Sequence, residues 1–119
     1  MVSSSKTSEA QRLYDAAIDC FADGNAAGAI ENFRACLAVD PPFLDAMHGL
    51  IRALQDAGEI DEAIVVAQQL IAIDPDDVLP HTSLSILYQR KGMIPEAEAE
   101  ATRAKVLGWK RQLKAGIRD

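Results

Sequence analysis

The sequence predicts an all-α fold, a right-handed α-solenoid of three helix-turn-helix repeats with a C-terminal capping helix. The first observation is a spacing of 34 residues between three glycines, Gly24, Gly58 and Gly92. An alanine follows five residues after each glycine, and an Asp-Pro pair recurs at the same interval of 34. These further markers are Ala29, Ala63, Ala97, Asp40-Pro41 and Asp74-Pro75. A hairpin of this length buries its apolar faces only against a neighbour, so the three units are expected to stack.

The first repeat is expected over residues 10–43. Apolar residues at helical spacing indicate its first helix, and they are Leu13, Ala16, Ala17, Cys20 and Phe21. Ser8 stands at capping-box distance from Gln11, which is typical of a helix start. Residues 1–8 are therefore expected to be a disordered N-terminus.

The glycines and prolines set the remaining helix ends. Each glycine is expected to end a first helix in the left-handed conformation, which glycine adopts without steric cost. Asn25 and Pro95 suit the starts of second helices, as a capping side chain and as a residue that needs no N–H partner there. The residue before a proline is disfavoured in a helix, which ends two second helices at Asp40 and Asp74. The second helices are thus expected over 26–39, 60–73 and 95–107.

The second and third repeats are expected over 44–77 and 78–109, which completes a repeat region of 9–109. Their first helices show the same apolar spacing, in Met47, Leu50, Ile51 and Leu54, and then in Leu84, Leu87 and Tyr88. Together, these positions predict two more amphipathic hairpins.

Residues 110–119 are expected to form a basic C-terminal capping helix or tail. Trp109, Leu113 and Ile117 recur at four-residue intervals, and Gly108 is expected to break the helix before them. One interpretation is a helix that covers the exposed core face of the third hairpin. The other is an interface with a second protomer or a partner.

Charge is divided unevenly along the chain. The net charge is −6, yet six of the twelve Lys and Arg residues lie within 103–118 with no acidic residue among them. Residues 1–102 hold 17 acidic and six basic residues, a formal charge of −11. Such a body is not expected to bind nucleic acid, because affinity for phosphates depends on clustered cations. The basic segment either offsets a helix dipole or forms a docking surface for an acidic protein or a membrane.

Catalytic residues, metal sites and cofactors are not expected. The glycines are explained by turns, and His48 and His81 lie 33 residues apart on different helices, without the spacing of metal ligands. Cys20 and Cys36 are expected about 10 Å apart along the helices, beyond the ~7 Å that a disulfide allows, as reduced core residues. A signal peptide and a membrane-spanning run are also absent from the sequence pattern, so a cytoplasmic location is expected.

A 34-residue helix-turn-helix unit with small residues at fixed places resembles the tetratricopeptide repeat family. The pattern is carried by Leu13, Ala17, Ala29, Phe33 and Pro41 in the first repeat, by Leu50, Ala63 and Pro75 in the second, and by Leu84, Ser85, Tyr88, Ala97 and Ala104 in the third. The third repeat departs from the pattern, since Trp109 replaces its closing proline. The resemblance implies a protein-protein interaction module without catalytic activity, whose first helices line a concave groove for a peptide or partner protein.

On this resemblance, the groove residues come from one face of each first helix. They are Tyr14, Ile18 and Phe21 in the first repeat, His48, Arg52 and Gln55 in the second, and Leu79, Thr82 and Ile86 in the third. The alternative for the apolar members, Ile18, Phe21 and Ile86, is packing between repeats.

Some members of the family clamp the C-terminal carboxylate of a heat-shock chaperone with Lys, Asn and Arg side chains. The corresponding places here hold Tyr14, Ile18, Gly49, Leu79 and Ser83, which cannot pair with a carboxylate as a cation does. That ligand is not expected. An extended or helical peptide with apolar anchors and a basic residue fits the groove better.

Three functions follow from these patterns. The first is an adaptor or scaffold that binds a protein or peptide in the groove. The second is a self-assembling structural unit that oligomerises through its end faces or C-terminal helix, so a homo-oligomer is left open. The third is a small chaperone of the secretion-chaperone type, and for all three a membrane partner is disfavoured.

Overall fold

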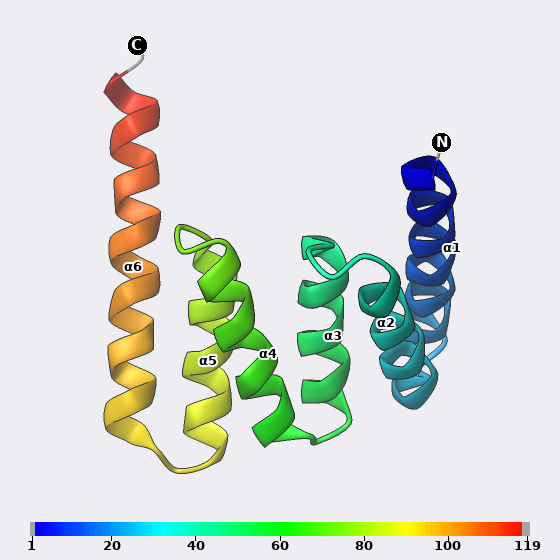
Figure 1. Ribbon diagram of the computed structural model, residues 1–119. Coiled ribbons are helices and arrows are strands. Elements are labelled where there is room, and N and C mark those ends of the chain that lie inside the picture. The colour runs from blue at the N-terminus through cyan, green and yellow to red at the C-terminus, as the bar shows by residue number, and fades with distance from the viewer. Residues whose placement is uncertain (1, 118–119) are drawn as a thin grey trace. The chain divides into compact units, whose positions relative to one another are not determined.

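The computed structural model describes the backbone of residues 2–117 and the side chains of residues 8–116. Over these residues it contains helices and no strand, which confirms the predicted all-α class (Figure 1). The helices are α1 (Val2–Ala22), α2 (Ala26–Val39), α3 (Leu44–Asp56), α4 (Ile60–Ile73), α5 (Val78–Arg90) and α6 (Ile94–Ile117). The chain forms two compact units, Met1–Val66 and Ala67–Asp119, and the boundary between them falls inside α4.

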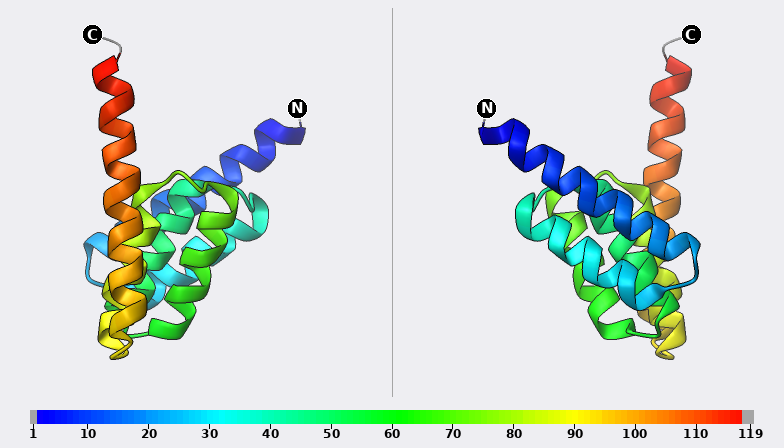
Figure 2. Two further views of the ribbon diagram at one scale, coloured as in Figure 1. Left: turned by 90° about the vertical axis from the view of Figure 1, so that its left-hand side faces the viewer. Right: turned by 90° about the vertical axis from the view of Figure 1, so that its right-hand side faces the viewer.

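The first unit contains α1, α2, α3 and the beginning of α4. α1 and α2 form an antiparallel hairpin, and α3 returns beside α2 (Figures 1 and 2). Ala17 and Ala29 are fully buried, so the two helices of the hairpin approach closely, as the alanine spacing predicted. Larger apolar side chains fill the rest of this core, among them Phe33, Met47, Leu50, Ile51 and Leu54.

A second close approach joins α2 to α3 at Gly49. The ring of Phe33 packs so near to this glycine that a Cβ there would lie 2.3 Å from Cζ and 2.5 Å from Cε1 of the ring. Phe33 is itself 1% exposed, so the ring has no room to withdraw. Gly49 is therefore a packing residue between the first hairpin and α3, whereas the sequence analysis named it only among the places of the chaperone clamp.

The three periodic glycines form the turns predicted for them. Gly24, Gly58 and Gly92 have φ values of +77°, +79° and +75°, in the left-handed region that favours glycine. In each turn the residue after the glycine donates its N–H to the carbonyl five residues before it. These bonds are Asn25 to Cys20 at 2.8 Å, Glu59 to Leu54 at 2.9 Å and Met93 to Tyr88 at 2.9 Å. The pattern is a Schellman motif, which satisfies the carbonyls at the end of a helix.

The other helix ends follow from the Asp-Pro pairs and capping side chains. The N–H groups of Asp40 and Asp74 donate the last helical bonds of α2 and α4, at 2.9 and 2.8 Å, before the proline stops each helix. The Asn25 side chain accepts from the N–H of Gly28 at 3.0 Å and opens α2. Asp77 opens α5 in the same way. The bounds of α2 and α4 agree with the ranges expected from the sequence.

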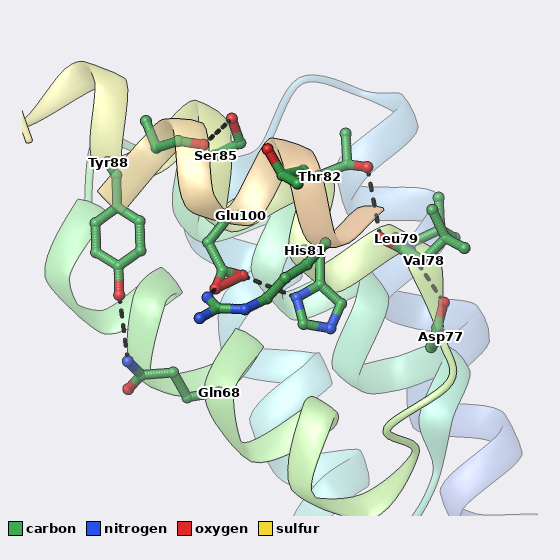
Figure 3. Close-up of polar contacts among 12 residues, drawn as sticks. Gln68, Asp77, Val78, Leu79, His81, Thr82, Ser85, Tyr88 and Glu100 are labelled. Atoms are coloured by element: carbon green, nitrogen blue, oxygen red, sulfur yellow. Dashed lines mark hydrogen bonds and ion pairs between the residues drawn. The ribbon is translucent and has the colours of Figure 1, made fainter. Parts of the chain in front are cut away.

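The second unit contains the end of α4, together with α5 and α6. α5 and α6 are antiparallel and cross where Ala97 is 1% exposed, which matches the role predicted for the third alanine. At the crossing, Ser85 Oγ donates to the carbonyl of Ala97 at 2.9 Å (Figure 3). The end of α4 joins this hairpin through Gln68, whose Nε2 donates to the Tyr88 hydroxyl at 3.4 Å.

Two helix ends differ from the sequence prediction. α1 begins at Val2, whereas residues 1–8 were expected to be disordered with Ser8 as the cap. The segment contains no proline or glycine, so nothing in its backbone opposes continuation of the helix toward residue 2. Met1 itself lies outside the described residues.

The C-terminal segment is also not a separate helix. α6 runs without interruption from Ile94 to Ile117, through the break predicted at Gly108 and past the expected helix end at residue 107. A helical glycine costs only about 1 kcal/mol relative to alanine, which neighbouring helix-forming residues offset. Residues 109–116 are all exposed, so this part of α6 buries little surface against its own hairpin.

Candidate protein-interaction surfaces

Tyr14 is the centre of an aromatic cluster on the first unit. Its ring stacks on Phe43, from the turn between α2 and α3, with ring centroids 5.2 Å apart and an interplanar angle of 19°. It also meets Phe33 in a tilted arrangement at 5.9 Å. Tyr14 and Phe43 are half-buried, so part of the cluster faces solvent. Phe43 was not predicted from the sequence, because the groove pattern counts only positions on first helices.

The charges of two carboxylates act on the hydroxyl of Tyr14. Burial raises the pKa of Tyr14 above its ordinary value of 10.0, and the nearby charges of Asp45 and Asp15 raise it further. Asp15 also accepts a hydrogen bond from Gln11 Nε2 at 3.0 Å. An aromatic side chain with carboxylates around its polar end favours a cationic group over an anionic one.

The remaining predicted groove residues of the first unit lie on α1 and α3. Ile18 is 39% exposed, whereas Phe21 is half-buried. Arg52 is exposed on α3, and His48 and Gln55 are half-buried there. α1 and α3 are neighbours in this unit, so these residues and Tyr14 belong to two adjacent helices.

The predicted groove residues of the second unit share one face of α5. Leu79, Thr82 and Ile86 follow at intervals of three and four residues, and all three are exposed. Leu79 is 59% and Ile86 40% exposed, while the Thr82 hydroxyl bonds back to the carbonyl of Val78 (Figure 3). These residues form an exposed surface of the second unit that is apolar except for one hydroxyl.

A buried polar cluster connects α5 to α6. His81 Nδ1 lies 2.8 Å from Glu100 Oε2, and both residues are almost fully buried (Figure 3). Glu100 also accepts from Arg103, which is one turn along α6 and remains exposed. Glu100 thus has two partners that stabilise its charge away from water. Sequence spacing did not reveal this contact, since His81 and Glu100 lie 19 residues apart on different helices.

The outer side of α6 carries large exposed apolar residues. Trp109 and Leu113, both predicted as interface residues, are 63% and 52% exposed, and Val106 is 41% exposed one turn before Trp109. We call Val106, Trp109 and Leu113 the α6 stripe. The side chain of Ile117, also predicted for this interface, lies outside the described side chains.

Cys20 and Cys36 are free thiols. Cys36 is buried in the first unit, and burial together with the charge of Asp40 raises the pKa of its thiol. Cys20 is half-buried and receives a weak hydrogen bond from Asn32. Within the described residues, no cluster of three or more His, Cys, Asp or Glu could hold a metal ion. The same residues include no helix with the length and apolar content needed to cross a bilayer.

A family model of the tetratricopeptide repeat matches residues 21–87, more than half of the chain. The chain belongs to the tetratricopeptide repeat family. The match covers the first turn glycine, the second repeat and most of α5, so the resemblance noted in the sequence is confirmed. The repeat hairpins described above are therefore tetratricopeptide repeats.

Solved structures agree with this fold. MamA superposes with a TM-score of 0.84 at 24% identity over 87% of this chain, and the Yersinia enterocolitica translocator chaperone SycD superposes with 0.80 at 23% over 85%. The second repeat domain of Spaghetti (RPAP3), bound to the HSP90 peptide SRMEEVD, gives 0.81 at 18% over 90%. SycD has also been solved with a peptide of the translocator YopD.

These neighbours differ in how much of their own length the chain spans. It spans 61% and 57% of two MamA structures, 75% of SycD and 99% of the RPAP3 domain. A sequence comparison with curated proteins gives no match. The likeness thus establishes the repeat fold, while ligands named for these proteins are theirs.

Proposed function

We propose that the protein is an interaction module, without catalytic activity, that binds a peptide segment of a partner protein on the α1–α3 face of the first unit. The observation that carries this proposal is the partly open aromatic cluster of Tyr14 and Phe43. Aromatic side chains that combine an apolar ring with a polar end are frequent anchors at protein interfaces. The exposed Ile18, one helical turn after Tyr14, extends the apolar area.

The charges around the cluster select the peptide. Asp15 and Asp45, whose charges raise the pKa of Tyr14, favour a Lys or Arg in the ligand, next to an apolar side chain that contacts Tyr14 and Ile18. Arg52 on α3 is exposed and available for an acidic or carbonyl group further along the peptide. The ligand class is thus a segment with an apolar anchor and an adjacent basic residue.

The peptide complexes of neighbouring proteins support this mode of binding. SycD and the RPAP3 domain share the repeat fold and were solved with peptides. The chain is not expected to bind the C-terminal carboxylate of a chaperone, because Ile18, Gly49 and Leu79 stand at places where the family's clamp has Lys, Asn or Arg. A small chaperone of the secretion-chaperone type would bind its substrate on the same face, so the proposal also covers that function.

Peptides selected from a random library on the intact protein test the proposal. We expect Ile18→Ser to weaken binding of the selected peptides at least about tenfold, because the variant removes an apolar contact worth about 1.4 kcal/mol or more. Asp45→Asn should weaken the binding of peptides that contain a basic residue, and this loss of affinity should be larger at low salt. Fluorescence anisotropy of labelled peptides gives the dissociation constants.

Each variant has a matched control elsewhere in the first unit. Val65→Ser changes an apolar side chain of comparable exposure on α4, and Asp23→Asn removes an exposed carboxylate in the turn between α1 and α2. Both controls should bind like the wild type. Selected peptides that bind Ile18→Ser and Asp45→Asn with unchanged affinity would overturn the proposed site.

A further inference from the structure

Trp109 and Leu113 of the α6 stripe lie on the side of the helix that faces away from α5. Glu100, which is 7% exposed, contacts α5 through His81. Trp109 follows nine residues later, and at 3.6 residues per turn this places it on the opposite side of the helix. Leu113 continues the same side one turn further on. The stripe is thus not the edge of the α5–α6 core.

The stripe is confined to the part of α6 that continues past α5. The earlier positions in line with Trp109 are Glu98 and Thr102, both polar and exposed. Figures 1 and 2 show that the C-terminal half of α6 extends beyond the end of α5 from every side drawn. Trp109 and Leu113 therefore lie where α6 has no neighbour in its own hairpin, and a second element is needed to bury them.

An open cavity adjoins the stripe. It has a volume of about 330 Å³ and is lined on α6 by Thr102, Arg103, Val106 and Leu107, and on the other side by Pro75 and His81. Val106 belongs both to the cavity and to the α6 stripe. A helix that lay along the stripe could therefore place one side chain in the cavity while covering Trp109 and Leu113.

The charge beside the stripe has one sign. Helical spacing puts Lys110 and Lys114 along one edge of the stripe and Lys105 along the other. Residues 101–117 contain no acidic residue. Two such helices from two copies would repel each other, whereas an acidic helix would neutralise both edges.

We propose that the α6 stripe and its adjoining cavity dock an acidic amphipathic helix of a partner protein. The apolar face of this helix covers Trp109 and Leu113 and fills the cavity, and its carboxylates pair with Lys105, Lys110 and Lys114. This site is distinct from the α1–α3 face in position and in ligand charge. It goes beyond the proposed function, and neither site depends on the other.

Trp109 is the only tryptophan of the chain, so its fluorescence reports directly on the stripe. The probe is a capped peptide of about 18 residues, with Leu at helical i, i+3, i+4 and i+7 positions and Glu on both flanks of this face. Added to the intact protein, it should shift the Trp109 emission to shorter wavelength and reduce quenching by iodide. A matched peptide with Lys in place of every Glu should produce neither change.

Variants separate the apolar and charged parts of the site. Leu113→Asp should weaken binding of the acidic peptide at least about tenfold. The fold should be retained, because Leu113 is exposed. The double variant Lys110→Glu and Lys114→Glu should lose affinity for the acidic peptide and gain affinity for the basic one. Arg12→Glu reverses an exposed charge on α1 and is the control for net charge. Ile18→Ser, which tests the α1–α3 face, should bind the acidic peptide like the wild type, so the two proposals can fail independently.

Other occupants of the stripe give different results. A concentration-dependent shift of Trp109 without any peptide, together with a larger mass by light scattering, would show that a second copy covers the stripe and would overturn the proposal. A shift with anionic phosphatidylglycerol vesicles but not with the acidic peptide would overturn it in favour of a membrane surface. Equal affinity for the acidic and basic peptides would show that the lysines do not select the partner.

Discussion

Gly49 and Gly108 are both glycines inside helices, yet their surroundings differ. A Cβ at Gly49 would lie within 3 Å of three atoms of the buried Phe33 ring, whereas a Cβ at Gly108 would meet nothing within 4 Å. Replacement of a helical glycine by alanine stabilises a helix by up to about 1 kcal/mol when space allows. The packing of Phe33 thus decides the sign of the effect at Gly49.

We expect Gly49→Ala to lower the free energy of unfolding by about 1 to 3 kcal/mol, because the clash with Phe33 outweighs the gain in helix propensity. Gly108→Ala carries the same chemical change without the clash, and it should leave stability unchanged or raise it slightly. Urea denaturation followed by circular dichroism measures both. Equal effects of the two substitutions would contradict the close approach of Phe33 to α3.

Tyr14 gives a pH-dependent prediction. Because its pKa is raised in the folded protein, the folded state holds the phenol proton at a pH where the unfolded state has lost it. The free energy of unfolding should therefore fall as pH rises from about 10 to the raised pKa. Asp45→Asn should lower the pKa of Tyr14 and leave it above 10.0, because burial is the larger cause.

Phenolate absorbance measures this titration, with Tyr88→Phe as background so that Tyr14 is the sole tyrosine. Asp23→Asn, in the turn between α1 and α2, is the control and should leave the pKa of Tyr14 unchanged. If Tyr14 titrates at 10.0 in the Tyr88→Phe protein, then the packed arrangement of Tyr14 beside Asp45 is wrong.

At the scale of elements, the pair α5 and α6 is joined by a polar contact within an apolar interface. Glu100 is buried and pairs with His81 at 2.8 Å and with Arg103. Removing one member of such a pair leaves the other buried without a partner, which costs far more than the pair itself contributes. We infer that the cluster favours one register of α6 against α5.

We expect His81→Leu alone to destabilise the protein by about 3 kcal/mol or more, because Glu100 loses a buried partner. The double variant His81→Leu and Glu100→Met replaces both groups by apolar side chains and should recover most of this loss. Thermal unfolding of the two single variants and the double variant completes the cycle. Additive losses in the double variant would show that the two side chains do not interact.

At the scale of the whole molecule, the fold is built by the repeat hairpins, while the end of α6 contributes charge and exposed surface. The side chains of 109–116 are exposed, although this segment is helical. Most helix stability in proteins comes from tertiary packing, so a projecting end contributes little to the stability of the rest. This explains why an uninterrupted helix can leave the α6 stripe uncovered.

A chain that ends at Leu107 tests this division. We expect its free energy of unfolding to lie within about 1 kcal/mol of the full chain, because the removed side chains bury little surface. A chain that ends at Met93 lacks all of α6 and should lose most of the structure of α5, because the face of α5 that packs on α6 then has no partner. A large loss of stability on ending at Leu107 would favour the capping role first expected for this segment.

Local features were predictable because they depend on the backbone alone. Gly24, Gly58 and Gly92 turn hairpins through their own conformational freedom, and Asp40 and Asp74 end helices because a proline follows them. The helix at Gly108 was mispredicted for a related reason, since a glycine ends a helix only where the chain turns into a left-handed residue. A glycine in the sequence does not by itself show whether it ends a helix in a turn or lies inside a continuous helix.

The candidate surfaces were only partly predictable. Ile18, Trp109 and Leu113, which were named from helical spacing, are exposed, whereas Tyr14 is half-buried. The partners Phe43 for Tyr14 and Glu100 for His81 come from other elements and followed no sequence rule. Contacts between elements depend on the crossing of two helices, and one sequence does not encode that crossing as a local pattern.

The sequence by itself determined the repeat length, the turns, the small residues at the crossings and thus the tetratricopeptide fold, because each depends on backbone sterics and helical period. Only the tertiary structure decided that Gly49 receives the Phe33 ring, that Glu100 pairs with His81 in the core, and that α6 continues past α5 with its stripe exposed. These features depend on which side chains two helices bring together, and packing settles that after the helices have formed.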